Sequence, residues 1–142
     1  MRRAALVLVA VLTAAPALAQ GAEQFVGRWG FVSYWNDADR AKSIAGARGS
    51  CGHPYVIARG PNGGAMMHAA DAAAPSELRL VSANGKTYLV PPGTVEPGNR
   101  ANRELIVVDA NTFITRYTHD EAHGRYGMMV YARCGGGGAN RR

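Results

Sequence analysis

Apolar and polar residues alternate in short runs along most of this 142-residue chain. Alternation with a period of two is typical of β-strands that bury one face. After residue 25 it predicts eight strands, at residues 28–35, 55–59, 64–70, 77–83, 86–90, 103–109, 112–118 and 125–133. Turn-forming residues separate most of these runs, so we expect each strand to pair with the next one along the chain.

The clearest pairing signal is Asn84-Gly85, which lies between the fourth and fifth predicted strands. These two residue types favour the positive φ angles of a type I′ hairpin turn. Residues 119–124 are expected to form a further turn, before the last strand. Residues 37–44 break the alternation and predict one short helix, with Asn36 as its N-cap.

Short, evenly spaced and sequentially paired strands predict an all-β fold. The expected architecture is a small antiparallel up-and-down eight-stranded β-barrel with one short helix. Closure into a barrel removes the exposed edges of the sheet. A β-sandwich stays open as an alternative, because periodicity does not report whether a sheet closes.

The N-terminus has the three regions of a secretory signal peptide, namely a basic start, an apolar run over 4–15 and a small-x-small pattern that ends at Ala19. We expect residues 1–19 to be removed and the protein to be periplasmic or secreted. Residues 20–134 then form a single barrel domain, followed by a disordered Gly-rich basic tail over 135–142. The apolar run is too short to span a membrane, and no second run could do so.

The formal charge of +6 comes from 16 Lys and Arg against 10 Asp and Glu. Arg2 and Arg3 lie in the signal segment, and Arg141 and Arg142 lie in the tail. Without these four, twelve basic residues face ten acidic ones, a net charge of about +2. The barrel domain also has no basic stripe, so we expect no nucleic-acid partner.

Cys51 and Cys134 are the only cysteines in the chain. An oxidising compartment favours a disulfide between them, which would stabilise the fold by roughly 4 kcal/mol. In a plain meander, however, Cys51 precedes a strand that starts at the rim opposite the end of the last strand. Either residues 36–50 cross back along the barrel, which we favour, or the strand count is wrong by one.

Gly27-Arg28-Trp29 at the start of the first strand resembles the G-x-W signature of lipocalin-like (calycin) barrels. The resemblance implies that Trp29 closes the base of the barrel and that a basic residue late in the last strand packs across it. Arg133 fits this role, with Arg125 as the alternative. Residues 36–54 correspond in position to the lid loop of such barrels.

Catalytic and cofactor motifs are missing from the chain. The run from His119 to His123 has neither HExxH nor HxxEH spacing, and we expect a solvated hairpin, with loose copper or zinc capture as the alternative. Met66-Met67-His68 and Met128-Met129 suggest copper, but adjacent strand residues point to opposite faces, which favours core or cavity methionines. No G-x-S-x-G or phosphate-binding loop is present. We therefore expect no enzymatic activity, no cofactor and no metal.

Large apolar side chains on nearly every strand form the candidate ligand-binding set. Its members are Trp29, Phe31, Trp35, Tyr55, Tyr88, Phe113, Tyr117 and Met129. Small barrels either fill their interior with such side chains or hold one small ligand, and both options stay open. Arg59 or Arg116, if it points inward, would favour a ligand with an acidic group.

These observations lead to two hypotheses about function. In the first, the protein is an exported, non-enzymatic barrel that holds a small, partly apolar or amphipathic ligand, gated by residues 36–54. In the alternative, it is a periplasmic protein-binding module, such as a protease or lysozyme inhibitor. Its loop 91–102 or residues 119–124 would then enter the cleft of an exported hydrolase.

Overall fold

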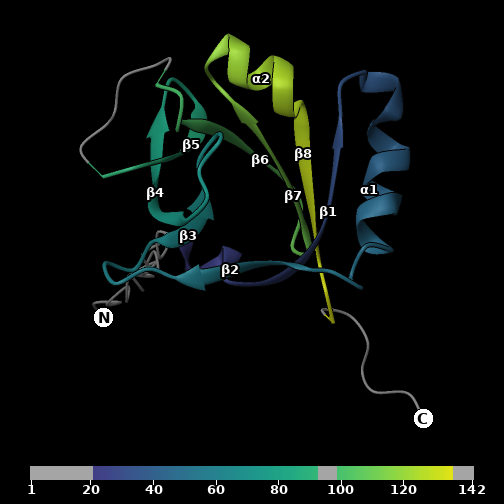
Figure 1. Ribbon diagram of the computed structural model, residues 1–142, viewed down its shortest axis with the longest axis horizontal. Helices are drawn as coiled ribbons and strands as arrows, with labels where there is room; N and C mark the ends of the chain where they lie inside the picture. The colour runs from purple at the N-terminus through teal and green to yellow at the C-terminus, as the bar shows by residue number, and fades with distance from the viewer. Residues whose placement is uncertain (1–20, 93–98, 136–142) are drawn as a thin grey trace, which may run out of the picture.

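The computed structural model describes residues 21–92 and 99–135, so the predicted signal peptide and nearly all of the predicted tail lie outside the described residues. Eight antiparallel strands form a closed up-and-down barrel, in which β1 pairs with β8 (Figure 1). The strands are β1 (Gly27–Tyr34), β2 (Tyr55–Arg59), β3 (Ala65–His68), β4 (Pro75–Ala83), β5 (Lys86–Val90), β6 (Arg103–Asp109), β7 (Thr112–Tyr117) and β8 (Met128–Arg133). The predicted barrel is confirmed, and the sandwich alternative is wrong.

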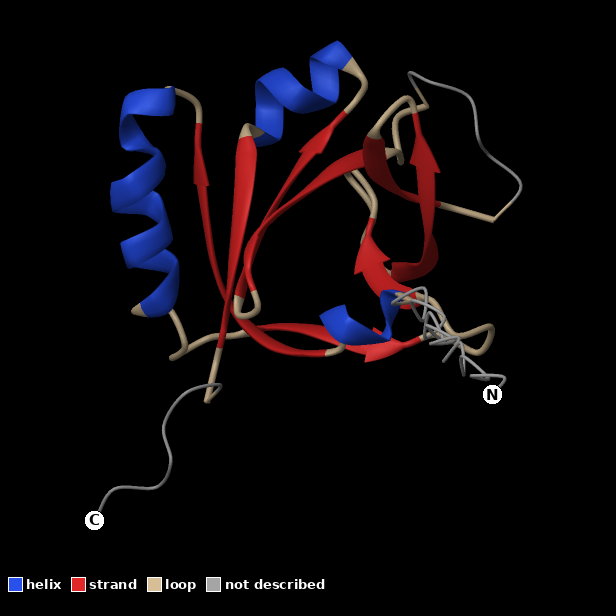
Figure 2. Ribbon diagram, turned by 180° about the vertical axis from the view of Figure 1, so that it is seen from behind, coloured by secondary structure: helices blue, strands red, loops and turns tan. Residues whose placement is uncertain are grey.

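The predicted helix over 37–44 is present as a 3-10 turn, η2 (Asp37–Asp39), followed by α1 (Arg40–Arg48). Asn36 precedes it in extended conformation, but its side chain makes no capping hydrogen bond, so the predicted cap is wrong. Figure 2 shows α1 running alongside the barrel wall. It buries an apolar cluster against the outer face of β1, β7 and β8, made of Tyr34, Ile44, Ala47, Ile114, Val130 and Ala132.

A second helix, α2 (Asp120–Tyr126), replaces the hairpin turn predicted for residues 119–124 and delays the start of β8 to Met128. Asp120 and Glu121 lie in its first turn, and His123 and Arg125 lie in its last turn. Side chains of these types at these ends interact favourably with the helix dipole. Its Ala122 is 1% exposed and belongs to the barrel core. This tertiary contact was not visible in the local turn pattern. None of the helices in the described ranges is long and apolar enough to cross a membrane.

The end of the barrel opposite α2 is closed by η1 (Ala22–Phe25) and by Trp29. The indole Nε1 of Trp29 donates a hydrogen bond to the carbonyl oxygen of Phe25 at 2.8 Å. The Arg133 guanidinium lies 4.2 Å from the Trp29 ring centre and donates to the carbonyl oxygen of Gln24 at 2.7 Å. Gly27 has a φ of +144°, and a Cβ there would lie 3.1 Å from Nη1 of Arg133. The chain therefore places Gly27, Trp29 and Arg133 together at the base.

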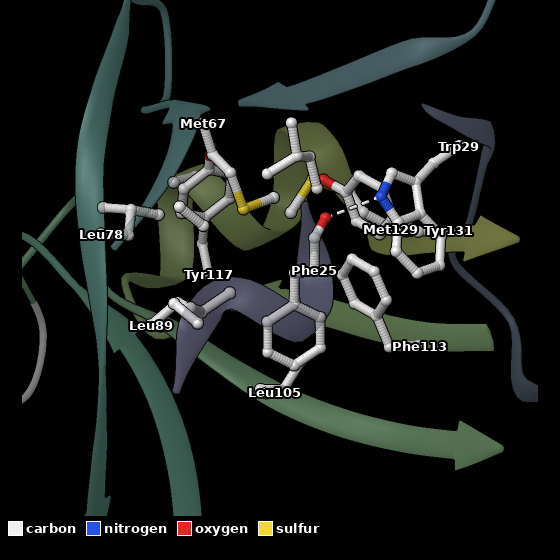
Figure 3. Close-up of a cluster of buried hydrophobic side chains, with 14 residues drawn as sticks. Phe25, Trp29, Met67, Leu78, Leu89, Leu105, Phe113, Tyr117, Met129 and Tyr131 are labelled. Atoms are coloured by element: carbon white, nitrogen blue, oxygen red, sulfur yellow. Dashed lines mark hydrogen bonds between the residues drawn. The ribbon is translucent and has the colours of Figure 1, made fainter. Parts of the chain in front are cut away.

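The core above this base consists of rings and aliphatic side chains from every strand (Figure 3). Phe113 stacks on Tyr131 with ring centres 4.5 Å apart and meets Trp29 edge-on at 4.7 Å. Such contacts stabilise aromatic pairs beyond the burial of their area. The lower half of the barrel is thus filled by side chains.

The disulfide between Cys51 and Cys134 is present, with the two Cα atoms 5.7 Å apart. The helix α1 runs back along the wall toward the rim where β8 ends (Figure 1). This return brings Cys51 to Cys134. The predicted crossing of residues 36–50 is therefore confirmed, and the predicted strand count stands.

Gly30 permits the close approach of α1 to the wall, because a Cβ at this position would overlap the carbonyl oxygen of Ala47. We expect Gly30→Ala to push α1 outward and to lower the free energy of unfolding by about 1–3 kcal/mol, as overpacking does in other cores. Urea unfolding measures this. Gly52→Ala is the control, because a Cβ there meets nothing within 4 Å. Equal midpoints for both variants would contradict the role of Gly30.

Candidate ligand cavity

A cavity of about 210 Å³ lies in the upper half of the barrel, between the aromatic core and α2. Its existence follows from uneven pairing of β1. One edge of β1 pairs with β8 from Trp29 to Tyr34, but the other edge pairs with β2 only from Gly27 to Trp29. Beyond Trp29, the wall therefore has no β2 partner. Phe31, which lines the cavity, is 37% exposed at this opening.

Four members of the predicted ligand-binding set line this cavity, namely Phe31, Tyr55, Tyr117 and Met129. They come from four different strands and are brought together only by closure of the barrel. Trp29 and Phe113 lie in the packed core instead, where they contact each other edge-on (Figure 3). These two residues support the floor without lining the cavity.

The structure does not bring Trp35 and Tyr88 to the cavity. Trp35 follows the last residue of β1, is 61% exposed, and donates from its indole to the carbonyl oxygen of Gly124 at 2.9 Å. Tyr88 lies opposite Glu104 on the outer face, whereas its neighbour Leu89 is buried inside. The run containing Tyr88 is apolar at consecutive positions, so alternation did not fix which residue points inward.

The inward arginine is Arg103, and the expectation that Arg59 or Arg116 would point inward is wrong. Arg59 pairs with Glu23 on the surface, and Arg116 pairs with Glu104 on the outer face. Arg103 is the first residue of β6 and is 1% exposed. It lies two residues before Leu105, which is also buried, so the alternation of β6 was the signal that could have identified it.

Arg103 is held in place by its neighbours in the cavity wall. Its Nη2 donates to the carbonyl oxygen of His68, and its guanidinium carbon lies 4.9 Å from the centre of the Tyr117 ring. The Tyr117 hydroxyl donates to the same carbonyl oxygen at 3.4 Å. Nε of Arg103 is buried and has no hydrogen-bond partner among the described residues. Arg103 also forms no salt bridge within that part of the chain.

The cavity wall also carries tyrosine hydroxyl groups and the imidazole of His68. The Tyr55 hydroxyl accepts a hydrogen bond from the backbone N–H of His68 at 2.9 Å and lies 3.2 Å from its Nδ1. Burial raises the pKa of Tyr131 and of Tyr117, although the charge of Arg103 opposes the rise in both. These phenols therefore stay protonated at neutral pH.

An acidic side chain, Asp71, lies at the rim of the cavity and forms hydrogen bonds with α2. Its carboxylate accepts hydrogen bonds from the Tyr126 hydroxyl at 2.8 Å, from Arg125, and from Arg100 at 3.2 Å. Arg100 also bonds to Glu121 of α2 at 2.8 Å. We call these five residues the Asp71 cluster. The hydrogen bonds from Tyr126 and Arg125 lower the pKa of Asp71.

Residues 36–54 do not gate the cavity, contrary to the expectation from sequence. They contribute none of its lining residues, and α1 packs on the far side of the wall. The segments beside the cavity are residues 69–72 and α2, which the Asp71 cluster joins. The described residues contain no group of three or more His, Cys, Asp or Glu side chains that could hold a metal ion.

The Asp71 cluster makes stability depend on pH. Because folding lowers the pKa of Asp71 below its ordinary value of 3.8, the ionised carboxylate stabilises the fold above that pH. This contribution is lost as the pH falls through the lowered pKa. We expect Asp71→Asn to lower the urea midpoint at neutral pH, and the difference from wild type to shrink as the solution is acidified.

Asparagine suits this test because it tolerates the positive φ of 60° at residue 71. Asp37→Asn is the control, because Asp37 is exposed and makes no salt bridge within the described residues. If the two variants behave alike at neutral pH, the cluster does not stabilise the fold.

Comparison with known proteins identifies no relative of this chain. No protein-family model matches the chain, and no curated protein does. No solved structure matches it either. The functional interpretation therefore starts from the geometry of the chain itself, an eight-stranded closed barrel with a disulfide and a partly enclosed cavity.

Proposed function

We propose that this protein is an exported, non-enzymatic binding protein that holds one small, partly apolar ligand inside its barrel. The cavity beneath α2 is the observation that carries the proposal. Its wall combines aromatic rings and a methionine with a few fixed polar groups, the composition usual for small-molecule sites. Its volume of about 210 Å³ is below that of sites for drug-sized ligands, so the ligand is compact.

The cavity is preformed, which favours binding. Met129 and Tyr131 on β8 and Tyr117 on β7 are positioned by the closed ladder around them, and the stacked Phe113 and Tyr131 rings form a rigid floor. A preformed site spends less free energy on ordering side chains when the ligand enters. The polar groups would orient the ligand, and the rings would supply most of the buried contact.

The architecture is of the lipocalin-like (calycin) type in this proposal. Gly27, Trp29 and Arg133 lie together at the base as that resemblance implies. Export through the predicted signal segment accounts for the disulfide, since an oxidising compartment is where such bonds form and persist. The ligand would then be captured outside the cytoplasm.

The inhibitor alternative receives no support from residues 119–124. They were expected to form an exposed loop that enters the cleft of a hydrolase, but most of them belong to α2, whose Ala122 is buried in the core. Glu121 is also engaged by Arg100. The second candidate loop, over 91–102, lies partly outside the described residues.

The proposal is tested by filling the cavity. Met129→Trp places a larger side chain into the open space, so we expect the affinity for a neutral probe, 3-phenylpropanamide, to fall at least about tenfold in isothermal titration. Stability should not fall, because cavity filling usually stabilises a fold. Val107→Trp is the matched control, because Val107 is 59% exposed.

Native mass spectrometry of protein purified from its own cells gives an independent readout. Wild type and Val107→Trp should carry a small-molecule adduct that Met129→Trp lacks. If wild type binds neither the probe nor any cellular compound, or if Met129→Trp overpacks the site and loses stability, the interior is a packed core and the proposed function is wrong.

A further inference from the structure

The structure points to a specific role for Arg103: we propose that it binds the anionic group of the ligand, which is a small carboxylate with an apolar, ring-sized body. This inference rests on the proposed ligand-binding function and names the chemistry of its ligand. Arg103 lines the cavity, is 1% exposed and has an unpartnered Nε.

A buried arginine without an opposite charge lowers the stability of the barrel when no ligand is bound. Guanidinium groups stay charged at every physiological pH, and buried charges are normally paired with an opposite charge. Arg103 has no carboxylate partner among the described residues; its contacts are the carbonyl oxygen of His68 and the face of the Tyr117 ring. Neither contact neutralises the charge. A carboxylate that reaches the guanidinium would do so and would accept a charge-assisted hydrogen bond from it.

The same two contacts orient the guanidinium before any ligand arrives. His68 accepts from one end of the group, and the Tyr117 ring restricts its plane. The His68 carbonyl is itself fixed, since its residue is held by the Tyr55 hydroxyl at the backbone N–H. Binding an anion at Arg103 therefore requires little ordering of the long side chain, which is the largest entropic cost of using an arginine.

Among the described residues, Asp71 is the one acidic side chain that also lines the cavity, and its charge is already compensated. Arg125 and Arg100 both form ion pairs with it, and Glu121 shares Arg100. Together with Arg103, this region has three arginines and two carboxylates. Its net charge is therefore positive, which favours the binding of an anion. The repulsion that Asp71 alone would exert on a carboxylate is offset by its partners.

The ligand body must fit the rest of the cavity. Phe31 and Tyr131 present rings 5.1 Å apart, and Met129 adds a polarisable thioether. These groups favour a flat apolar body over a sugar or a peptide. The proposed ligand therefore carries its acid group at Arg103 and its apolar part toward the opening beside Phe31.

The test compares two probes with the same ring and chain, 3-phenylpropanoate and 3-phenylpropanamide, of which only the first carries a negative charge. Isothermal titration at neutral pH uses the oxidised protein. We expect wild type to bind the carboxylate at least about tenfold more tightly, the size expected of a hydrogen bond to a charged group. Arg103→Met should lose this preference by weakening the carboxylate alone. Arg79→Met, which removes an exposed arginine from β4, should keep it.

A second measurement separates ligand binding from a structural role. Without ligand, Arg103→Met should unfold at the same temperature as wild type or a higher one, because an uncompensated buried charge is removed. Arg103→Lys keeps the charge but lacks Nε, and should retain part of the preference for the carboxylate.

Each outcome bears on the inference. Equal affinity of wild type for the two probes overturns the role of Arg103 but leaves the ligand-binding function standing. A carboxylate preference that survives in Arg103→Met, or a large drop in its unfolding temperature, also overturns it. Failure of both probes to bind overturns this inference together with the proposed function.

Discussion

The pairing of β1 with β8 is the interaction on which the rest of this structure depends. It closes the barrel over six residue pairs, from Trp29–Arg133 to Tyr34–Met128. The inward faces of the same two strands supply Phe31, Met129 and Tyr131 to the cavity. The outward faces form the apolar surface on which α1 packs, and the end of β8 provides Cys134 for the disulfide. Closure, cavity and helix packing are therefore consequences of one ladder.

The fold was largely predictable because its signals are local. Period-two alternation and the Asn84-Gly85 turn act over a few residues, and all eight strands are found close to their predicted ranges. The disulfide followed from the presence of only two cysteines. The helix α2 was missed because its formation depends on burial of Ala122 in the core, which is a contact between elements far apart in the chain.

The candidate site was predictable only in part. Four members of the predicted set reach the cavity. Tyr88 does not, because adjacent residues of its strand are apolar, and Trp35 does not, because it lies just beyond the end of its strand. Arg103 was overlooked because a charged residue at the start of a strand is usually solvent-exposed. Its place on the inner face follows the alternation of β6 with Leu105, and the strand register sets it beside Leu89 and Tyr117.

The short contact between β1 and β2 has a consequence for how fast a ligand can exchange. Beyond Trp29 no β2 hydrogen bonds close the wall, so a small molecule can pass sideways beside Phe31 without breaking the ladder. For the proposed ligand, exchange would then require side-chain rearrangement at this opening and not opening of the barrel. In the proposed ligand-binding function, the covalent bond between Cys51 and Cys134 therefore stabilises the scaffold without closing the route by which a ligand would leave.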